Sequence, residues 1–377
     1  MATESITELA SIIATSTAQV SAYLDQNGLP QPSFAVTGPS TSQIPPSEVE
    51  IESARLTAID ATQRLRNLLL GPHDFLTSIT PSEWISFQAV ARFGLASCVP
   101  IDGSASCATL AAACGLPEST TRRLLRHAVV KNVFCEAGPD GVAHNAVSRL
   151  LAEKPTLNAW LRFNTGDSWS AASQTVEALA RWHGSEEPNE TGFTLASGTG
   201  LGMYDTYAVQ PERGERFANS MKNLTESPGF DAGHLVAGYD WASLKSAVVV
   251  DLGGSHGAVA RRLVESFPTL SVVVQDLAEV IAQAPPSQTH ISFMSHDFFT
   301  PQPVVADVYL FRWILHNWSD KYCAAADLIM LQLFNSKERD MEDWAALFET
   351  ADSRFRFQGG RLPTGSRLSV LEAVWEG

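Results

Sequence analysis

The chain has 377 residues, enough for two or three domains that each bury an apolar core. Hydrophobic residues make up 45% and charged residues 18% of it, a balance typical of globular proteins. With 41 acidic and 26 basic residues the net charge is −15, which repels nucleic acid and anionic membrane surfaces. We therefore expect neither of them as a partner, and a small, largely neutral substrate instead.

The cysteines and the first residues bear on the cellular compartment. Five cysteines are scattered along the chain, without a CxxC pair or histidines at ligand spacing: Cys98, Cys107, Cys114, Cys135 and Cys323. They predict reduced thiols in a cytoplasmic protein and no metal site. Glu4 comes early and no basic segment precedes the first apolar positions, which argues against a signal peptide. About 18 consecutive apolar residues occur nowhere, so we expect no membrane-spanning helix.

The N-terminal third is predicted to be helical. Residues 1–47 are expected to form one helix and a linker rich in Pro, Ser, Gly and Thr. A helical pattern resumes at residue 48. Thr80, Pro81 and Glu83 have the spacing of an N-cap, a first-turn proline and a capping box, and they predict the start of a further helix.

Residues 107–150 have the pattern helix, turn, helix, hairpin, which is typical of a winged helix, and we expect it to complete a domain over 48–155. Three arginines on its second helix could contact phosphates as a DNA-recognition helix does: Arg122, Arg123 and Arg126. We favour a packing module, because the chain is acidic and no wider basic surface accompanies them.

Residues 156–240 are predicted to be helical and to form a substrate pocket. The candidate lining residues are Trp169, Met203, Met221, Phe230 and His234. Aromatic and methionine side chains at helical spacing are equally typical of an ordinary core, so we assign none of them to binding.

Strands alternate with helices from residue 247. Continuous apolar runs such as AVVVDLGG, SVVVQDL, HISFMSHDF and ADVYLFRWI are typical of buried parallel strands. We therefore expect an α/β fold of the Rossmann-like kind over residues 241–377, behind the mainly helical N-terminal part.

A glycine-rich turn follows the first of these strands, which ends at Asp251. Its glycines allow the backbone to approach a ligand closely: Gly253, Gly254 and Gly257. The turn lacks the GxGxxG spacing that suits a pyrophosphate and the GK[ST] of a P-loop. A cofactor without phosphates fits it better.

Acidic residues end the next two strands. Asp276 follows Gly257 by 19 residues, where a carboxylate can accept hydrogen bonds from ribose hydroxyls. Asp297 and Phe298 follow the third strand at the same edge of the sheet. Each of them alone is as consistent with helix capping or core packing, but their order predicts a nucleoside-like site.

The segments VVVDLGGSHG, VVVQDL, HDFF and FRWILHNWSD together resemble the fungal S-adenosylmethionine-dependent O-methyltransferases, of the same broad family as the plant caffeate-type enzymes. The resemblance runs from about residue 60 to the end. It implies a winged-helix dimerisation domain, a homodimer and S-adenosylmethionine as cofactor. The acceptor would be a hydroxyl of a small aromatic or polyketide-derived secondary metabolite.

The resemblance also implies which residues hold the cofactor: Gly253, Gly254, Asp276, Asp297, Phe298 and Arg312. The glycines would contact the methionine part, the first aspartate the ribose, and the next two residues the adenine. His316 coincides with the general base of the family, and Glu338 with a carboxylate that assists it. An imidazole suits this role because its ordinary pKa of about 6.5 leaves much of it neutral at cellular pH.

One strand of the family pattern is missing. After Cys323 the chain passes directly into DLIMLQLFN, where the family has a further strand and a second acidic residue. Either the final hairpin, RFRFQ with RLSVLEAVW, fills the gap, or buried backbone groups stay unpaired. A wrongly assigned splice junction would explain the gap, and so would a genuine deletion in an inactive protein. We favour the former, because the motifs on both sides keep the family order.

Two other functions remain open. The same fold and pocket can serve a cyclase or pericyclase, in which Arg312 and His316 act electrostatically or as acids. The chain can also be a non-catalytic partner built on a degraded methyltransferase fold.

Overall fold

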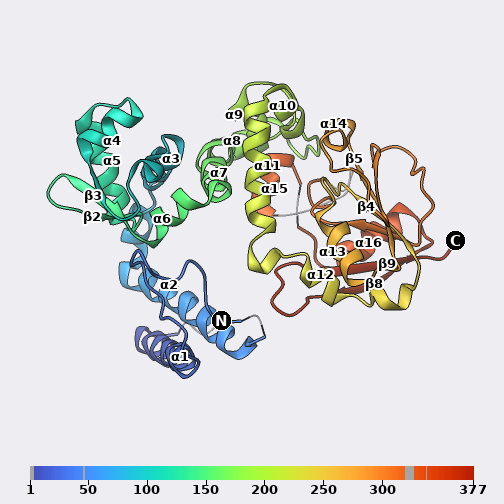
Figure 1. Ribbon diagram of the computed structural model, residues 1–377, viewed down its shortest axis with the longest axis horizontal. Coiled ribbons are helices and arrows are strands. Elements are labelled where there is room, and N and C mark those ends of the chain that lie inside the picture. The colour runs from blue at the N-terminus through green and yellow to red at the C-terminus, as the bar shows by residue number, and fades with distance from the viewer. Residues whose placement is uncertain (1–3, 46, 319–326, 337) are drawn as a thin grey trace. The chain divides into compact units, whose positions relative to one another are not determined.

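The computed structural model describes residues 4–45, 47–318, 327–336 and 338–377 (Figure 1). The chain divides into two compact units. The first comprises Met1–Gly166 with Arg216–Asn223, and the second comprises Asp167–Glu215 with Leu224–Gly377. Cys323 lies outside the described residues.

Two long helices open the first unit, α1 (Ile6–Gln26) and α2 (Val49–Thr77). Ser5 and Glu8 form a capping box at the start of α1. The two helices pack on each other, and the described residues of the predicted linker between them form no helix or strand. Helix α2 is interrupted at Gly71, whose φ of 68° is left-handed, and Pro72 follows at the break.

The predicted helix start near residue 80 is confirmed. Thr80 caps the short helix η1 (Pro81–Trp84) by accepting a hydrogen bond from the backbone N–H of Ser82, and α3 (Ile85–Arg92) continues from it. The predicted capping box is wrong, because the Glu83 carboxylate instead accepts a hydrogen bond from Lys131 Nζ at 2.8 Å.

A helix–turn–helix and a small sheet follow. The elements are η2 (Leu95–Cys98), β1 (Ser104–Ser106), α4 (Cys107–Cys114), α5 (Glu118–Val130), β2 (Phe134–Glu136) and β3 (Gly141–His144). The antiparallel sheet has the order β1-β3-β2, and the predicted hairpin joins β2 to β3. Arg122 on α5 forms ion pairs with Glu118 and Asp140, so its charge is neutralised locally.

Short helices lead from the hairpin to the second sheet. They are α6 (Ala146–Glu153), α7 (Pro155–Phe163), the π-helical turn η3 (Asn164–Ser168), α8 (Trp169–Arg181), α9 (Gly192–Ser197), α10 (Met203–Val209), α11 (Pro211–Thr225), η4 (Pro228–Phe230), α12 (Gly233–Gly238) and η5 (Trp241–Leu244).

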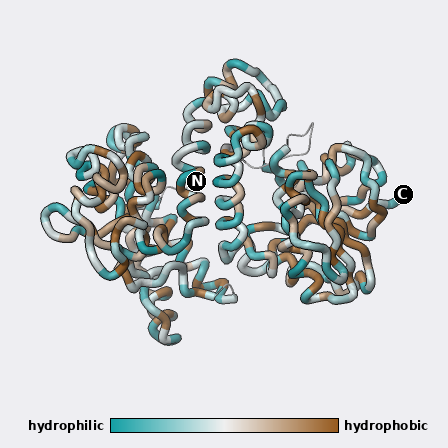
Figure 2. Tube along the Cα trace, turned by 45° about the horizontal axis from the view of Figure 1, so that its top comes forward, coloured by the Kyte–Doolittle hydropathy of each residue, from teal (hydrophilic) through white to brown (hydrophobic). Residues whose placement is uncertain are grey.

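A four-stranded parallel sheet is the centre of the second unit. Its strands are β4 (Val248–Leu252), β5 (Ser271–Asp276), β6 (Ile291–Ser295) and β7 (Val308–Phe311), and their order is β6-β5-β4-β7. Helices α13 (Ala258–Ser266) and α14 (Ala278–Ile281) connect β4 to β5 and β5 to β6. Apolar residues are concentrated in the part of the chain around this sheet (Figure 2). Strands β4 and β5 are largely buried, whereas Tyr309 and Phe311 of β7 are 42% and 39% exposed, so one face of β7 is open to solvent.

The end of the chain does not complete this sheet. Helices α15 (Asp327–Phe334) and α16 (Met341–Ala351) precede an antiparallel hairpin of β8 (Phe355–Arg361) and β9 (Val370–Trp375). The hairpin forms a sheet of its own, so the expectation that it fills the gap is wrong. Within the described ranges no strand pairs with the outer edge of β7, and the sheet lacks one strand as predicted.

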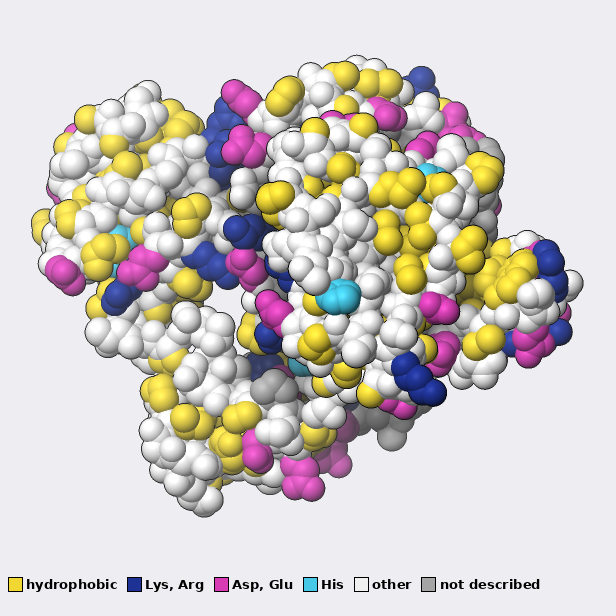
Figure 3. All heavy atoms as spheres, turned by 45° about the vertical axis from the view of Figure 1, so that its right-hand side comes forward, with side chains coloured by type: hydrophobic (Ala, Val, Ile, Leu, Met, Phe, Trp, Pro, Cys, Tyr) yellow, Lys and Arg dark blue, Asp and Glu magenta, His cyan; other side chains and the backbone are white. Residues whose placement is uncertain are grey.

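The surface carries both charge signs. On the face seen in Figure 3, lysine and arginine side chains lie beside acidic ones and form no continuous basic area. In the described part of the chain, no helix combines the length and apolar character needed to cross a bilayer.

Candidate functional site

The glycine turn after β4 is held against the neighbouring strand. The backbone N–H groups of Gly253 and Gly254 both donate to the carbonyl of Gln275, at 2.8 and 3.2 Å. Gly253 has a left-handed φ of 68°, and a Cβ there would collide with Ile314 of the segment after β7. The turn therefore brings that segment directly onto the glycines.

Asp251 lies under this turn and is buried, with 2% of its surface exposed. Its Oδ2 has no hydrogen-bond partner among the described residues, and a Cβ on Gly254 would lie 2.6 Å from it. Burial raises the pKa of Asp251 to about 7, against the opposing charge of Arg312 and with a further increase from Asp276. An unpaired buried acceptor of this kind fits a cationic group of a ligand.

Asp276 stands at the end of β5, as predicted. Its two carboxylate oxygens accept hydrogen bonds from the backbone N–H groups of Ser255, at 2.9 Å, and Leu277, at 2.8 Å. Burial raises its pKa, and these two hydrogen bonds oppose the increase. Each carboxylate oxygen has a second lone pair, so both can still accept from a ligand hydroxyl.

Asp297 and Phe298 follow β6 at the same edge. The Asp297 carboxylate is exposed and accepts a hydrogen bond from the N–H of Phe299 at 3.0 Å. Phe298 packs against Phe299, with ring centroids 4.7 Å apart, and both rings stand edge-on to Trp318. These residues form an aromatic cluster next to the carboxyl ends of the strands.

Arg312 follows β7 and is engaged with the protein itself. Its guanidinium donates to the backbone carbonyl of Phe230. Burial lowers the pKa of Arg312, while the charges of Asp251 and Asp231 oppose this. The charges of Arg312 and Asp251 attract each other, since each opposes the effect of burial on the pKa of the other.

His316 lies five residues beyond β7. Its ring is 5.1 Å from that of Trp313, measured between centroids, and Trp313 is 5.2 Å from Phe230. Burial lowers the pKa of His316 to about 4, with a backbone hydrogen bond to Trp313 opposing. The imidazole is therefore neutral at cellular pH, as a proton acceptor must be.

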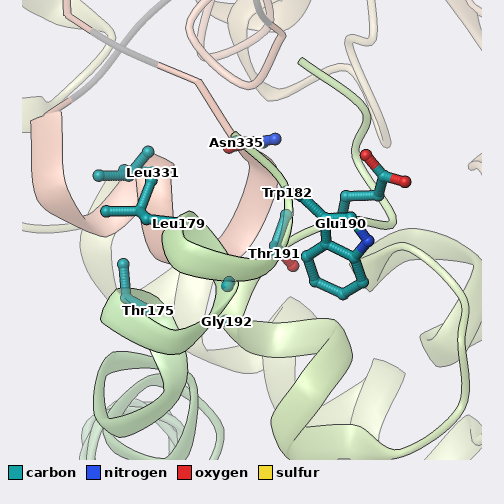
Figure 4. A pocket seen from close by; sticks show the side chains of 9 residues that line it. Thr175, Leu179, Trp182, Glu190, Thr191, Gly192, Leu331 and Asn335 are labelled. Carbon is teal, nitrogen blue, oxygen red and sulfur yellow. The ribbon is translucent and has the colours of Figure 1, made fainter. Parts of the chain in front are cut away.

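Helix α15 sets the position of the loop that carries Glu338. It packs on α8 and α9, where Leu331 and Asn335 lie beside Leu179 and Thr191 (Figure 4). The Asn335 amide donates to the carbonyl of Ser185 at 2.7 Å. Ser336 Oγ then donates to the backbone carbonyl of His316 at 3.1 Å, two residues before Glu338.

Three residues that belong to this site escaped the sequence analysis. In the sequence Asp251 stands out only as the end of a strand, and its burial without a described partner for Oδ2 arises from the packing around it. Trp313 and Trp318 lie in the same motif as His316 but carry no charge or spacing signal. Trp313 has a left-handed φ of 63°, which is rare for a bulky residue and typical of functional sites.

The O-methyltransferase domain family matches residues 178–326. The O-methyltransferase pyvH of Aspergillus violaceofuscus (strain CBS 115571) is 38% identical and covers 100% of both chains. That alignment spans 430 positions, 53 more than this chain has residues, so the relative contains segments without a counterpart here. The grayanic acid biosynthesis cluster O-methyltransferase of Cladonia grayi is 33% identical, over 98% of this chain and 88% of the relative.

Solved structures share the fold. The crystal structure of OxaC in complex with sinefungin and meleagrin superposes with a TM-score of 0.74 at 18% identity, and covers 97% of this chain and 98% of that one. A structure described as a pericyclic reaction enzyme gives a TM-score of 0.66 at 22% identity, over 89% of this chain and 94% of that one.

Proposed function

This chain belongs to the O-methyltransferase family, and from that premise we propose that His316 is the general base for methylation of a small-molecule hydroxyl. Its similarity to fungal relatives supports an S-adenosylmethionine-dependent O-methyltransferase that acts on secondary metabolites. The observation that carries the proposal is the neutral imidazole of His316, on a segment that packs onto the glycine turn through Ile314. We take the acceptor to be an aromatic or polyketide-derived metabolite.

The residues of the turn fit the cofactor. S-adenosylmethionine, when bound, supplies a methyl group on a positively charged sulfur. The unpaired Oδ2 of Asp251 fits its ammonium group, and Gly253 and Gly254 leave room for its methionine part. Asp276 would hold the ribose hydroxyls, while Asp297 and Phe298 would flank the adenine.

The protein's own groups then act on the acceptor. His316 accepts the proton of the acceptor hydroxyl, which makes the oxygen nucleophilic. Arg312 donates to the carbonyl of Phe230 and interacts electrostatically with Asp251, and it would fix the wall of the cofactor site. Glu338 would assist the base from the loop that Ser336 ties to His316.

The test is the variant His316→Ala. We expect it to abolish methyl transfer and to leave the affinity for S-adenosylhomocysteine within about twofold of the wild type, because the base does not hold the cofactor. Calorimetry measures the second quantity. Unchanged turnover in this variant would refute the role of His316.

A cyclase is the second candidate, because among the described residues no strand continues the sheet beyond β7, where the resemblance implies one, while Arg312 and His316 are retained. In that case a substrate would leave with unchanged mass, and mass spectrometry of the product separates the two reactions. A chain that does not bind S-adenosylmethionine would instead favour a non-catalytic partner.

We also propose a homodimer built on the N-terminal helices, with β1–β3, α4 and α5 interpreted as a winged helix beside them. Val49, Leu56 and Ile59 follow each other at seven and three positions on α2, so they share one face, and they are 61%, 51% and 55% exposed. An apolar stripe of this kind is typical of a protein interface.

An open groove of about 420 Å³ lies between the two helices beside the break in α2, with Leu9, Leu68 and Phe75 in its wall. Replacing Leu56 and Ile59 by Glu should give a monomer in sedimentation equilibrium. Thr57→Glu should not, because Thr57 is exposed but follows Leu56 by one position and so lies about 100° around the helix from the apolar stripe. The four described cysteines that are free agree with a cytoplasmic location, which we propose on that ground.

A further inference from the structure

Trp313 combines two unfavourable features beside His316. Its backbone is left-handed, with a φ of 63°, although it is neither glycine nor asparagine. Its indole Nε1–H is buried, and among the described residues it has no hydrogen-bond partner. Its ring contacts both Phe230 and His316.

Both features cost free energy in the protein alone. A bulky side chain in the left-handed region is strained, and a buried donor without an acceptor has lost its hydrogen bond to water without replacement. Such costs at one residue are typical of a site whose partner is a ligand. The indole N–H can therefore take an acceptor atom of a ligand, and the ring that carries it contacts the imidazole of His316.

We propose that the indole N–H of Trp313 binds a second oxygen of the acceptor substrate, adjacent to the hydroxyl that His316 deprotonates. This inference rests on the proposed function of His316. A hydrogen bond to the reacting oxygen itself would stabilise its negative charge before transfer and slow the reaction. A neighbouring oxygen avoids this effect and still orients the hydroxyl towards the base.

The substrate class that follows is an aromatic hydroxyl with a carbonyl or hydroxyl oxygen at the next position. A related compound without the second oxygen would bury the indole N–H again without a partner. Sites built to hydrogen-bond a group discriminate strongly against ligands that lack it, for this reason.

The experiment compares two isomers of one skeleton, 1-hydroxyanthraquinone, whose hydroxyl neighbours a carbonyl, and 2-hydroxyanthraquinone, whose hydroxyl does not. Absorption titration with the protein saturated in S-adenosylhomocysteine gives both dissociation constants. We expect the wild type to prefer the first isomer by roughly tenfold or more, and Trp313→Phe to reduce this preference to about twofold, because the variant keeps an aromatic ring and loses only the donor.

Trp241→Phe is the matched control, because its indole Nε1 already donates to the carbonyl of Leu235 at 3.1 Å. It should lower the melting temperature of the free protein and leave the isomer preference unchanged. Trp313→Phe should lower the melting temperature less, because in the free protein its N–H has no bond to lose.

Three results would overturn the inference. In the first, the wild type shows no preference or binds neither isomer. In the second, Trp313→Phe keeps the preference. In the third, this variant weakens only the affinity for S-adenosylhomocysteine, which assigns the donor to the cofactor. Failure of the proposed function is distinct, since the titration needs no reaction. A preserved preference without any methyl transfer would support the role of Trp313 and contradict that of His316 as a base.

Discussion

Replacing Asp251 by Asn should stabilise the free protein against unfolding and lower its affinity for the cofactor. Burial raises the pKa of Asp251 from 3.8 to about 7, which is roughly three units, and each unit corresponds to about 1.4 kcal/mol. The ionised carboxylate therefore costs at most about 4 kcal/mol above pH 7. The Asn amide also needs hydrogen-bond partners in this buried place. We therefore expect Asp251→Asn to raise the free energy of unfolding by only about 1–2 kcal/mol at pH 8.

The pH dependence has a definite sign. Because the folded-state pKa is the higher one, the folded protein holds a proton that the unfolded chain releases between pH 4 and 7. The stability that this carboxyl contributes is present at pH 4 and is lost as the pH rises through 7. The difference in unfolding free energy between Asp251→Asn and the wild type should therefore grow over this window and become constant above it.

Urea denaturation at several pH values measures the first effect, and calorimetry with S-adenosylhomocysteine measures the second. Loss of a hydrogen bond to a charged group should weaken binding by about 10- to 100-fold. Asp307→Asn is the control, because this exposed carboxylate accepts from the N–H of Val248 at the other end of β4. A variant that is less stable at pH 8, or binds the cofactor as before, would refute this account of Asp251.

Three further predictions concern single residues. Burial lowers the pKa of His316 from 6.5 to about 4, so the folded protein loses stability as the pH falls from 6.5 towards 4. His316→Ala should remove up to about 3 kcal/mol of this pH dependence. Denaturation curves at pH 4.5 and 8 measure it. Asp276→Asn should weaken binding of S-adenosylhomocysteine by about tenfold or more, measured by calorimetry, and unaltered affinity would contradict its contact with the ribose. Leu263 on α13 is fully buried, so Leu263→Ala should lower the free energy of unfolding by about 2–5 kcal/mol. A loss below about 1 kcal/mol would show that α13 packs differently.

The sequence alone determined the elements around the cofactor site. Runs of Val predicted β4 and β5 closely, because a strand buried on both faces must be apolar along its length, and shorter apolar runs predicted β6 and β7. The glycine turn and Asp276 were predicted because few residues suit a left-handed bend or a strand end at a ligand. The gap in the order of motifs after Cys323 likewise predicts that no strand follows β7 in the sheet, as is the case within the described ranges.

Only the tertiary structure decided how deeply these groups are buried and which partners they have. Glu83 bonds Lys131, 48 residues away, instead of completing its local capping box, because side chains select the nearest partner in space. Likewise the C-terminal hairpin pairs with itself rather than with β7. The unpaired atoms of Asp251 and Trp313 follow from burial by segments distant in the chain. Burial and the presence of a partner depend on the whole fold, so no local pattern could predict them.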